Sequence, residues 1–235
     1  MPYKKNRAGL FVPDDDLIKP GVCNMFAATH LSGFGGGGEA PVEYATLDSG
    51  NNPGVNSLSG GDLVLTTSFA NYGWTCATVG KSSGKWYFEM SIDQACKADP
   101  GYDLFGFVHS TDSGGTTTPL GNTANSFGYY AVDGKIRNNS TGTAFGSSVP
   151  AGLVMGCALD MDNGYAYWRR DGVWQDSGDP TSGASGTGAG ASGLSGTYLP
   201  CASDYSGTGT GIYTFNFGAS AFADAAPSGY TGVTV

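Results

Sequence analysis

The residues that could do acid–base or nucleophilic chemistry are few in this chain. It has two histidines, His30 and His109. An enzyme needs a nucleophile, an acid–base pair or a metal, with the groups within reach of one another. His109 directly follows the apolar run at residues 104–108, a position typical of a surface histidine, and no Gly-x-Ser-x-Gly nucleophile elbow is present. We therefore expect no catalytic residue and no enzymatic activity.

Carboxylates are the second group of residues with possible chemistry. A pair of them can hydrolyse a glycoside when both line one cleft. The sequence does not place the candidates in one cleft, and most of them are expected to be solvated loop residues. Residues 160–164 resemble the start of a calcium loop, but the glycine stands fifth rather than sixth, and a hairpin turn explains them. The candidate carboxylates are Asp93, Asp99, Asp103 and Asp112.

Cysteines are the third group. No Cys-x-x-Cys pair occurs among them, so a structural zinc site is not expected. Cys157 stands in an apolar run, where a free buried thiol is the favoured interpretation. The wide spacing fits thiols in a reducing cytoplasm, and we expect neither a metal nor a cofactor. The five cysteines are Cys23, Cys76, Cys96, Cys157 and Cys201.

Two glycine-rich stretches interrupt the chain. Residues 33–38 match the pattern Gly-x-Gly-x-x-Gly, but no strand precedes them and no helix follows. A flexible linker over residues 33–41 is the better interpretation. Residues 177–196 are nearly all glycine, serine, alanine and threonine without a phosphate-binding lysine, which indicates a long surface loop or a loop packed on a neighbour.

The elements that must position any site are short strands. Residues 85–92 alternate, with Trp86, Phe88, Met90 and Ile92 on one predicted face. Asn-Gly and Asp-Gly turns at 163–164, 133–134 and 171–172 favour hairpins. Short strands that end in such turns predict an all-β, antiparallel sandwich or barrel. Further strands are expected at residues 63–67, 104–108, 127–132, 153–161, 165–170 and 212–217.

Aromatic residues near predicted turns are the strongest indication of binding. Trp74, Tyr102, Trp168 and Trp174 lie there, and such rings stack on sugars or anchor protein interfaces. We expect about half of them to be buried, because Trp168 alternates with tyrosines along a hairpin. The candidate ligand-binding residues of the edge loops are Trp74, Tyr102, Asp103, His109, Arg169, Arg170 and Trp174.

Residues 1–32 differ from the rest, since their sparse apolar residues cannot bury a core. The net charge of −9 over 235 residues disfavours nucleic-acid binding. No signal peptide or membrane-spanning stretch is seen, so a soluble protein without membrane insertion is expected. The predicted organisation is an arm at 1–32, a linker at 33–41 and a sandwich at 42–235. The arm residues expected to dock on a partner are Tyr3, Lys4, Lys5, Arg7, Phe11 and Phe26.

Three segments of the sandwich region form a recognisable set: residues 83–89, residues 156–172, and Tyr198 to Pro200 followed by 215–218 and 227–230. In order and spacing these segments resemble the SPRY family. The resemblance covers about residues 45–231. It departs from the family where Arg169 and Arg170 replace a usual Lys-Asn pair, and where residues 177–196 look like an insertion. These departures lie in loops and leave the ligand open.

The resemblance implies a bent, concanavalin-like sandwich of two antiparallel sheets with a binding surface at one edge, and a binding role without catalysis. The glycine-rich character is similar to that of SPRY-like proteins in tailed-phage particles. We therefore expect a virion protein, a capsid decoration or head fibre, that contacts other virion proteins and forms a symmetric oligomer. The alternatives are a tail-fibre module that binds a host surface glycan or protein, and an intracellular peptide-binding adaptor.

Overall fold

The computed structural model divides the chain into two units, Met1–Ala40 and Pro41–Val235. It describes residues 41–49, 56–67, 73–112, 118–204 and 209–235, and in the first unit the backbone of β1 (Tyr3–Lys5) and β2 (Phe11–Pro13), which pair antiparallel. His30, Cys23 and the docking candidates Arg7 and Phe26 lie outside the described residues, as does the glycine run at 33–38. Within the described residues, no helix has the length and apolar character required to cross a membrane.

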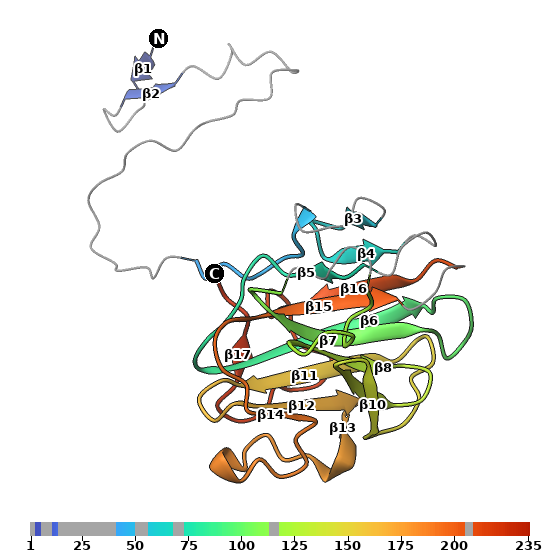
Figure 1. The fold of residues 1–235 in the computed structure, drawn as a ribbon. Coiled ribbons are helices and arrows are strands. Elements are labelled where there is room, and N and C mark those ends of the chain that lie inside the picture. The colour runs from blue at the N-terminus through green and yellow to red at the C-terminus, as the bar shows by residue number, and fades with distance from the viewer. Residues whose placement is uncertain are drawn as a thin grey trace. The chain divides into compact units, whose positions relative to one another are not determined.

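The second unit consists of two stacked sheets (Figure 1). The larger has nine strands, in the order β13-β12-β11-β6-β16-β4-β3, with β14 paired to β12 and β17 paired to β6. All of these pairs are antiparallel except β17 with β6. Its strands are β3 (Ser57–Ser59), β4 (Val64–Thr66), β6 (Lys85–Gln94), β11 (Val154–Asp160), β12 (Tyr165–Arg170), β13 (Val173–Trp174), β14 (Ala191–Ser192), β16 (Ile212–Asn216) and β17 (Thr231–Gly232).

The smaller sheet has six antiparallel strands, in the order β10-β9-β8-β7-β15-β5. Two short 3-10 helices, η4 (Gln175–Ser177) and η5 (Gly183–Ser185), lie in the segment that follows β13. The strands of this sheet are β5 (Thr75–Cys76), β7 (Asp103–His109), β8 (Ser126–Tyr130), β9 (Lys135–Asn138), β10 (Thr141–Ala144) and β15 (Tyr198–Asp204). The predicted all-β sandwich of two sheets is confirmed.

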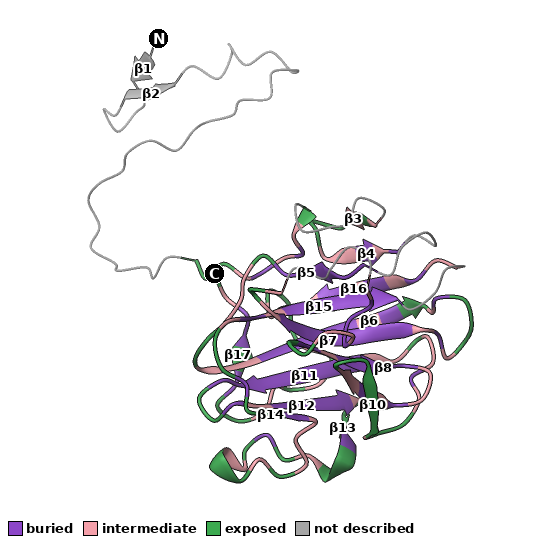
Figure 2. Ribbon diagram, viewed as in Figure 1, coloured by how far each residue is buried: buried purple, intermediate pink, exposed green. Residues whose placement is uncertain are grey.

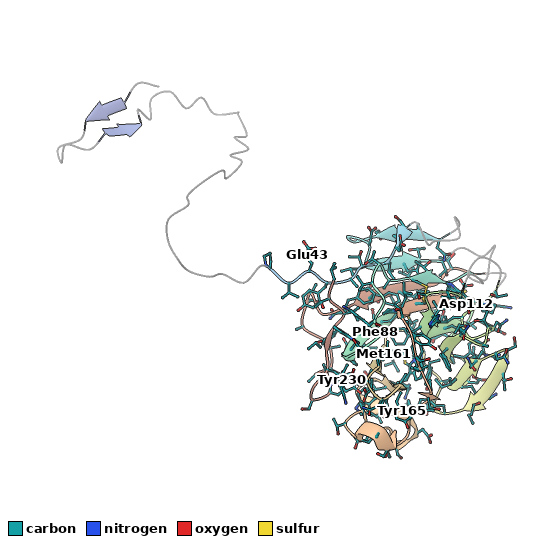
Figure 3. All side chains as sticks on the ribbon, turned by 60° about the vertical axis from the view of Figure 1, so that its left-hand side comes forward. Glu43, Phe88, Asp112, Met161, Tyr165 and Tyr230 are labelled. Carbon is teal, nitrogen blue, oxygen red and sulfur yellow. A yellow bond between two sulfur atoms is a disulfide. The ribbon has the colours of Figure 1, made fainter. Side chains whose placement is uncertain are left out.

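The main core lies between the sheets, where alternate residues of the strands meet. Phe88, Met90 and Ile92 of β6 are buried there, as the alternation predicts, and Trp86 packs against them. Figure 3 shows Phe88 amid the side chains of the interior, and Figure 2 shows the buried central strands. Burial of apolar surface of this extent is the main driving force for folding.

The outer face of each sheet carries a smaller apolar cluster. Tyr87 and Tyr167 lie on the outer face of the larger sheet with Tyr230, whose hydroxyl donates to the Pro180 carbonyl at 2.9 Å. The glycine-rich segment 177–196 therefore packs on its own domain, where the hydroxyl of Tyr165 also donates to the Ala184 carbonyl. On the smaller sheet, Trp74 belongs to the second cluster.

Two cysteines differ from the sequence-based expectation. Cys76 and Cys201 stand opposite each other on β5 and β15 and form a disulfide, so the expectation of reduced thiols is wrong for this pair. The reason is register: pairing of β5 with β15 brings together two residues that are 125 positions apart. Cys157 is a free, buried thiol, as expected, and Cys96 is also buried. Burial also raises the pKa of the Cys157 thiol.

The beginning and end of the sandwich meet. Tyr44 forms an antiparallel bridge with Thr234, and backbone hydrogen bonds join Ala45 to Val233 and Val235 to Glu43. Figure 3 shows Glu43 at the border of the domain. These contacts close the sandwich at the end of the chain.

Candidate functional site

Three of the predicted ligand-binding side chains are buried and do not face an edge loop. Trp74 is only 3% exposed, within the outer cluster of the smaller sheet. Asp103 accepts hydrogen bonds from the Tyr213 hydroxyl (2.6 Å) and the Cys96 backbone N–H (2.8 Å). Burial, opposed in part by these hydrogen bonds, raises the pKa of Asp103 to about 6. The prediction that Trp74 and Asp103 lie in exposed edge loops is therefore wrong, because side chains packed across the strands enclose both residues.

Arg169 is the third of these side chains. Its guanidinium donates to the Glu89 carboxylate (3.3 Å) and to the backbone carbonyls of Asp224 (2.6 Å) and Ala225 (2.9 Å). Glu89 also accepts the Tyr87 hydroxyl and the backbone N–H groups of Ala223 and Asp224. A buried ion pair of this kind needs such additional hydrogen bonds to offset desolvation. The pair fastens residues 223–225 to the outer face of the larger sheet.

The remaining predicted residues are partly exposed but do not gather at one place. Tyr102 and His109 flank opposite ends of β7. Trp174 lies against the Arg169 guanidinium, 5.2 Å from the ring centroid, and Arg170 is half-buried at the end of β12. Of the arm candidates, Tyr3, Lys4 and Lys5 lie on β1 and Phe11 on β2. The predicted set is therefore dispersed, and only His109 lines the hollow described next.

Two neighbouring hollows, which share Phe127 and Ser192, form a depression that we call the edge groove. The larger, of about 550 Å³, lies between β10 and the segment 189–192. The smaller, of about 370 Å³, extends toward the end of β7. The first is lined by Asn138, Asn139, Thr141, Thr143, Phe145 and Asp176, and the second by His109, Thr111, Asn125, Leu194, Ser195 and Tyr198.

One side of the larger hollow is formed by the hairpin of β9 and β10. Asn139 and Ser140 form its two-residue turn with φ of 50° and 60°, the left-handed values that a type I′ turn requires. The other side of the hollow is formed by the segment 189–192, which packs closely on two aromatic rings at Gly190. A Cβ at Gly190 would lie 2.9 Å from both the Phe145 and the Trp168 ring, so only glycine allows this close approach. Both sides of the hollow therefore have a backbone conformation that specific local contacts define.

His109 lines the smaller hollow, where Thr111 contacts its ring. The Thr111 backbone N–H donates to Nδ1 at 3.3 Å, and the Thr111 hydroxyl lies 2.8 Å from the same atom. Nδ1 acts as the acceptor of this backbone N–H. Among the described groove residues, the ring is hydrogen-bonded to Thr111 and not to Ser192 or Ser195, so they form no nucleophile–base pair.

The groove is nearly uncharged. Asp176 is the single carboxylate among its lining residues, and no lysine or arginine lines it. Hydroxyl, amide and small apolar groups make up most of the surface. In the described part of the chain, no three His, Cys, Asp or Glu side chains cluster closely enough to hold a metal ion. The arrangement is suited to noncovalent binding through hydrogen bonds.

The sequence pattern did not reveal most of these residues. Residues 138–141 attract attention only as polar turn residues, and β10 contains no apolar alternation. The insertion-like segment 177–196 was the one available signal, because a loop added at the edge of a sandwich can form one bank of a groove.

The comparisons agree with this architecture. The family model of the SPRY domain matches residues 85–189. The SPRY domain of human HERC1 has a TM-score of 0.55 at 15% identity, over 72% of this chain and 96% of that one. A second human SPRY domain has a TM-score of 0.51 at 19% identity, over 71% of this chain and 98% of that one. No curated protein sequence matches the chain. The resemblance to the SPRY family is thereby confirmed for this part of the chain, and SPRY domains in general are noncatalytic binding modules.

Proposed function

We propose that residues 41–235 form a protein-binding module whose ligand surface is the edge groove, and that the chain is an accessory protein of a phage particle. The observation that carries the first part is the groove itself. It lies on a rigid sandwich between an exposed hairpin and an ordered loop. Binding residues are commonly carried on such edges, because the scaffold positions them without contributing chemistry of its own.

Other features support the particle setting. The chain has a separate N-terminal unit, whose residues 1–32 would attach the module to other virion proteins. The Cys76–Cys201 disulfide suits a protein that works outside a reducing cytosol, as virion surface proteins do. A net charge of −9 with few charged residues favours solubility at high copy number.

The test is site-specific photo-crosslinking in particles of the phage that encodes the chain. A photoreactive residue at Asn139, on the groove, is expected to join the chain to a second protein, whereas one at Asp62, an exposed turn position away from the groove, is not. Equal crosslinking at both positions would argue against the groove as the ligand surface. Absence of the chain from purified particles would overturn the virion assignment, and an Asn139 adduct found in cytosol instead would favour the intracellular adaptor.

A further inference from the structure

The free edge of β10 is the feature of the groove that points to a specific kind of ligand. β10 is the last strand of the smaller sheet, and among the described strands it pairs only with β9. All four of its residues are exposed, as Figure 2 shows. Its sequence, Thr-Gly-Thr-Ala, has none of the charged residues or prolines that usually protect a sheet edge from further pairing.

The register shows which backbone groups face outward. In a two-residue hairpin the residues that flank the turn exchange both hydrogen bonds, and the pattern alternates from there. Thr141 pairs with Asn138 and Thr143 with Ile136, so these threonines direct their backbone groups toward β9. Gly142 and Ala144 direct theirs toward the free edge, and within the described residues no other backbone hydrogen bond involves either.

Space and charge beside this edge match an extended segment. The hollow of about 550 Å³ lies between residues 189–192 and the face of the β9–β10 hairpin that carries Thr141 and Thr143, and it adjoins the free edge at Ala144. Asp176 lines the same hollow and is exposed, and it forms no ion pair with any described basic residue. A ligand with a basic side chain could therefore form an ion pair with the Asp176 carboxylate.

The aromatic residues of the groove do not suit a sugar. Phe127 stacks on Phe107 at 5.3 Å, and Phe145 packs edge-on against Trp168 at 6.1 Å. Tyr198 is buried. The lining residues of the groove thus offer no open tryptophan or tyrosine face on which a sugar ring would stack.

We infer that the edge groove binds an extended peptide segment of a partner protein, which adds to β10 as a strand and places a lysine or arginine beside Asp176. Strand addition of this kind takes its affinity from main-chain hydrogen bonds and its specificity from side-chain contacts. The inference rests on the proposed binding function and names the ligand class of that site. Four edge residues limit the paired part of the ligand to a short segment.

The experiment selects binders to the full chain from a random heptapeptide library and measures their affinities by calorimetry. Enriched peptides are expected to contain a lysine or arginine. Gly142→Pro removes an outward N–H without touching the β9 pairing, and should weaken binding about tenfold for the one lost hydrogen bond. Asp176→Asn should weaken it about fivefold, as expected for an exposed ion pair. Asp62→Asn, an exposed left-handed aspartate outside the groove, is the matched control with no effect.

A second measurement does not depend on the folding of a variant. Selected peptides are resynthesised with N-methyl groups on alternate amides, and one of the two alternating sets should abolish binding to the wild-type chain. No enriched peptide, unchanged affinity for both methylated sets, or groove-dependent binding of glycans on an array would each overturn strand addition. An Asn139 crosslink in particles combined with any of these results would leave the binding function in place and refute only the peptide mode.

Discussion

At the scale of single residues, the domain depends on charged groups that it buries. Glu89 and Arg169 have side chains that are only 4% and 6% exposed. The two side chains form an ion pair with each other, and each is also hydrogen-bonded to the backbone of residues 223–225. That segment covers the outer face of the larger sheet. Removal of Glu89 leaves the buried Arg169 charge with only the longer ion pair to Asp224 at 3.7 Å, and loss of a partner from a buried pair is strongly destabilising.

Glu89→Gln should therefore lower the free energy of unfolding by about 3 kcal/mol. Asp133→Asn is the matched control, since Asp133 pairs with Lys135 at 2.8 Å where both side chains are partly exposed. Such a surface pair is expected to contribute about 1 kcal/mol or less. Urea denaturation of both variants measures the difference, and equal losses would contradict the structural role of the Glu89–Arg169 pair.

Asp103 makes the stability depend on pH in an unusual direction. Its pKa, raised by burial to about 6 from an ordinary 3.8, means that the folded protein holds this proton more tightly than the unfolded chain. The stabilisation is fully present below pH 3.8 and is lost as the pH rises through 6. Between pH 4.5 and 7.5 this group should remove about 2 kcal/mol of stability.

Asp103→Asn tests that expectation, because the amide does not titrate. Urea unfolding at pH 4.5 and pH 7.5 should show a smaller decline in the variant than in the wild-type chain, by about 2 kcal/mol. The comparison uses the change with pH, so a constant cost of the substitution cancels. Parallel pH profiles would show that Asp103 titrates normally.

At the scale of elements, the longer apolar strands were predictable, as were β4 and β8 from the expected runs at 63–67 and 127–132, whereas the short strands and β15 were not. The predicted runs at 85–92, 104–108, 153–161, 165–170 and 212–217 coincide with β6, β7, β11, β12 and β16. β15 was missed, since Pro200 cannot donate to a ladder and argues against a central strand. Pro200 nevertheless lies within β15, opposite Phe107 of β7. The Pro200 carbonyl accepts a hydrogen bond from the Ala77 backbone N–H.

The candidate site was harder to predict than the fold. A one-dimensional pattern shows that Trp74, Asp103 and Arg169 are near turns or strand ends, but it does not show what packs over them. The groove is built from residues about 50 positions apart in the sequence, on β10 and the segment 189–192, which only the sandwich topology brings together. The disulfide was missed for the same reason.

The Cys76–Cys201 disulfide holds the short edge strand β5 on β15. By closing a long loop in the unfolded chain it should contribute about 4 kcal/mol. Cys201→Ala is expected to lose about this amount in urea denaturation, and a reductant should destabilise the wild-type chain but not the variant. Two free thiols in the wild-type protein under oxidising conditions, titrated at these positions, would refute the bond.

At the scale of the whole molecule, the buried apolar clusters formed by the described residues lie within residues 45–233. The sandwich should therefore fold without the N-terminal unit. A fragment of residues 41–235 is expected to match the full chain within about 1 kcal/mol in urea denaturation, at an equal dependence on denaturant. A markedly less stable fragment would show that residues 1–40 contribute to the fold.

The bridge between Tyr44 and Thr234 has a practical consequence for engineering. Because the domain starts and finishes at one point, a recipient protein could receive the whole sandwich within a single surface loop, with entry and exit a few ångströms apart. The sandwich could then be inserted into another protein as a unit. The β9–β10 hairpin and the glycine-rich segment 177–196 would keep their geometry, because neither contains the residues at which the two chains are joined.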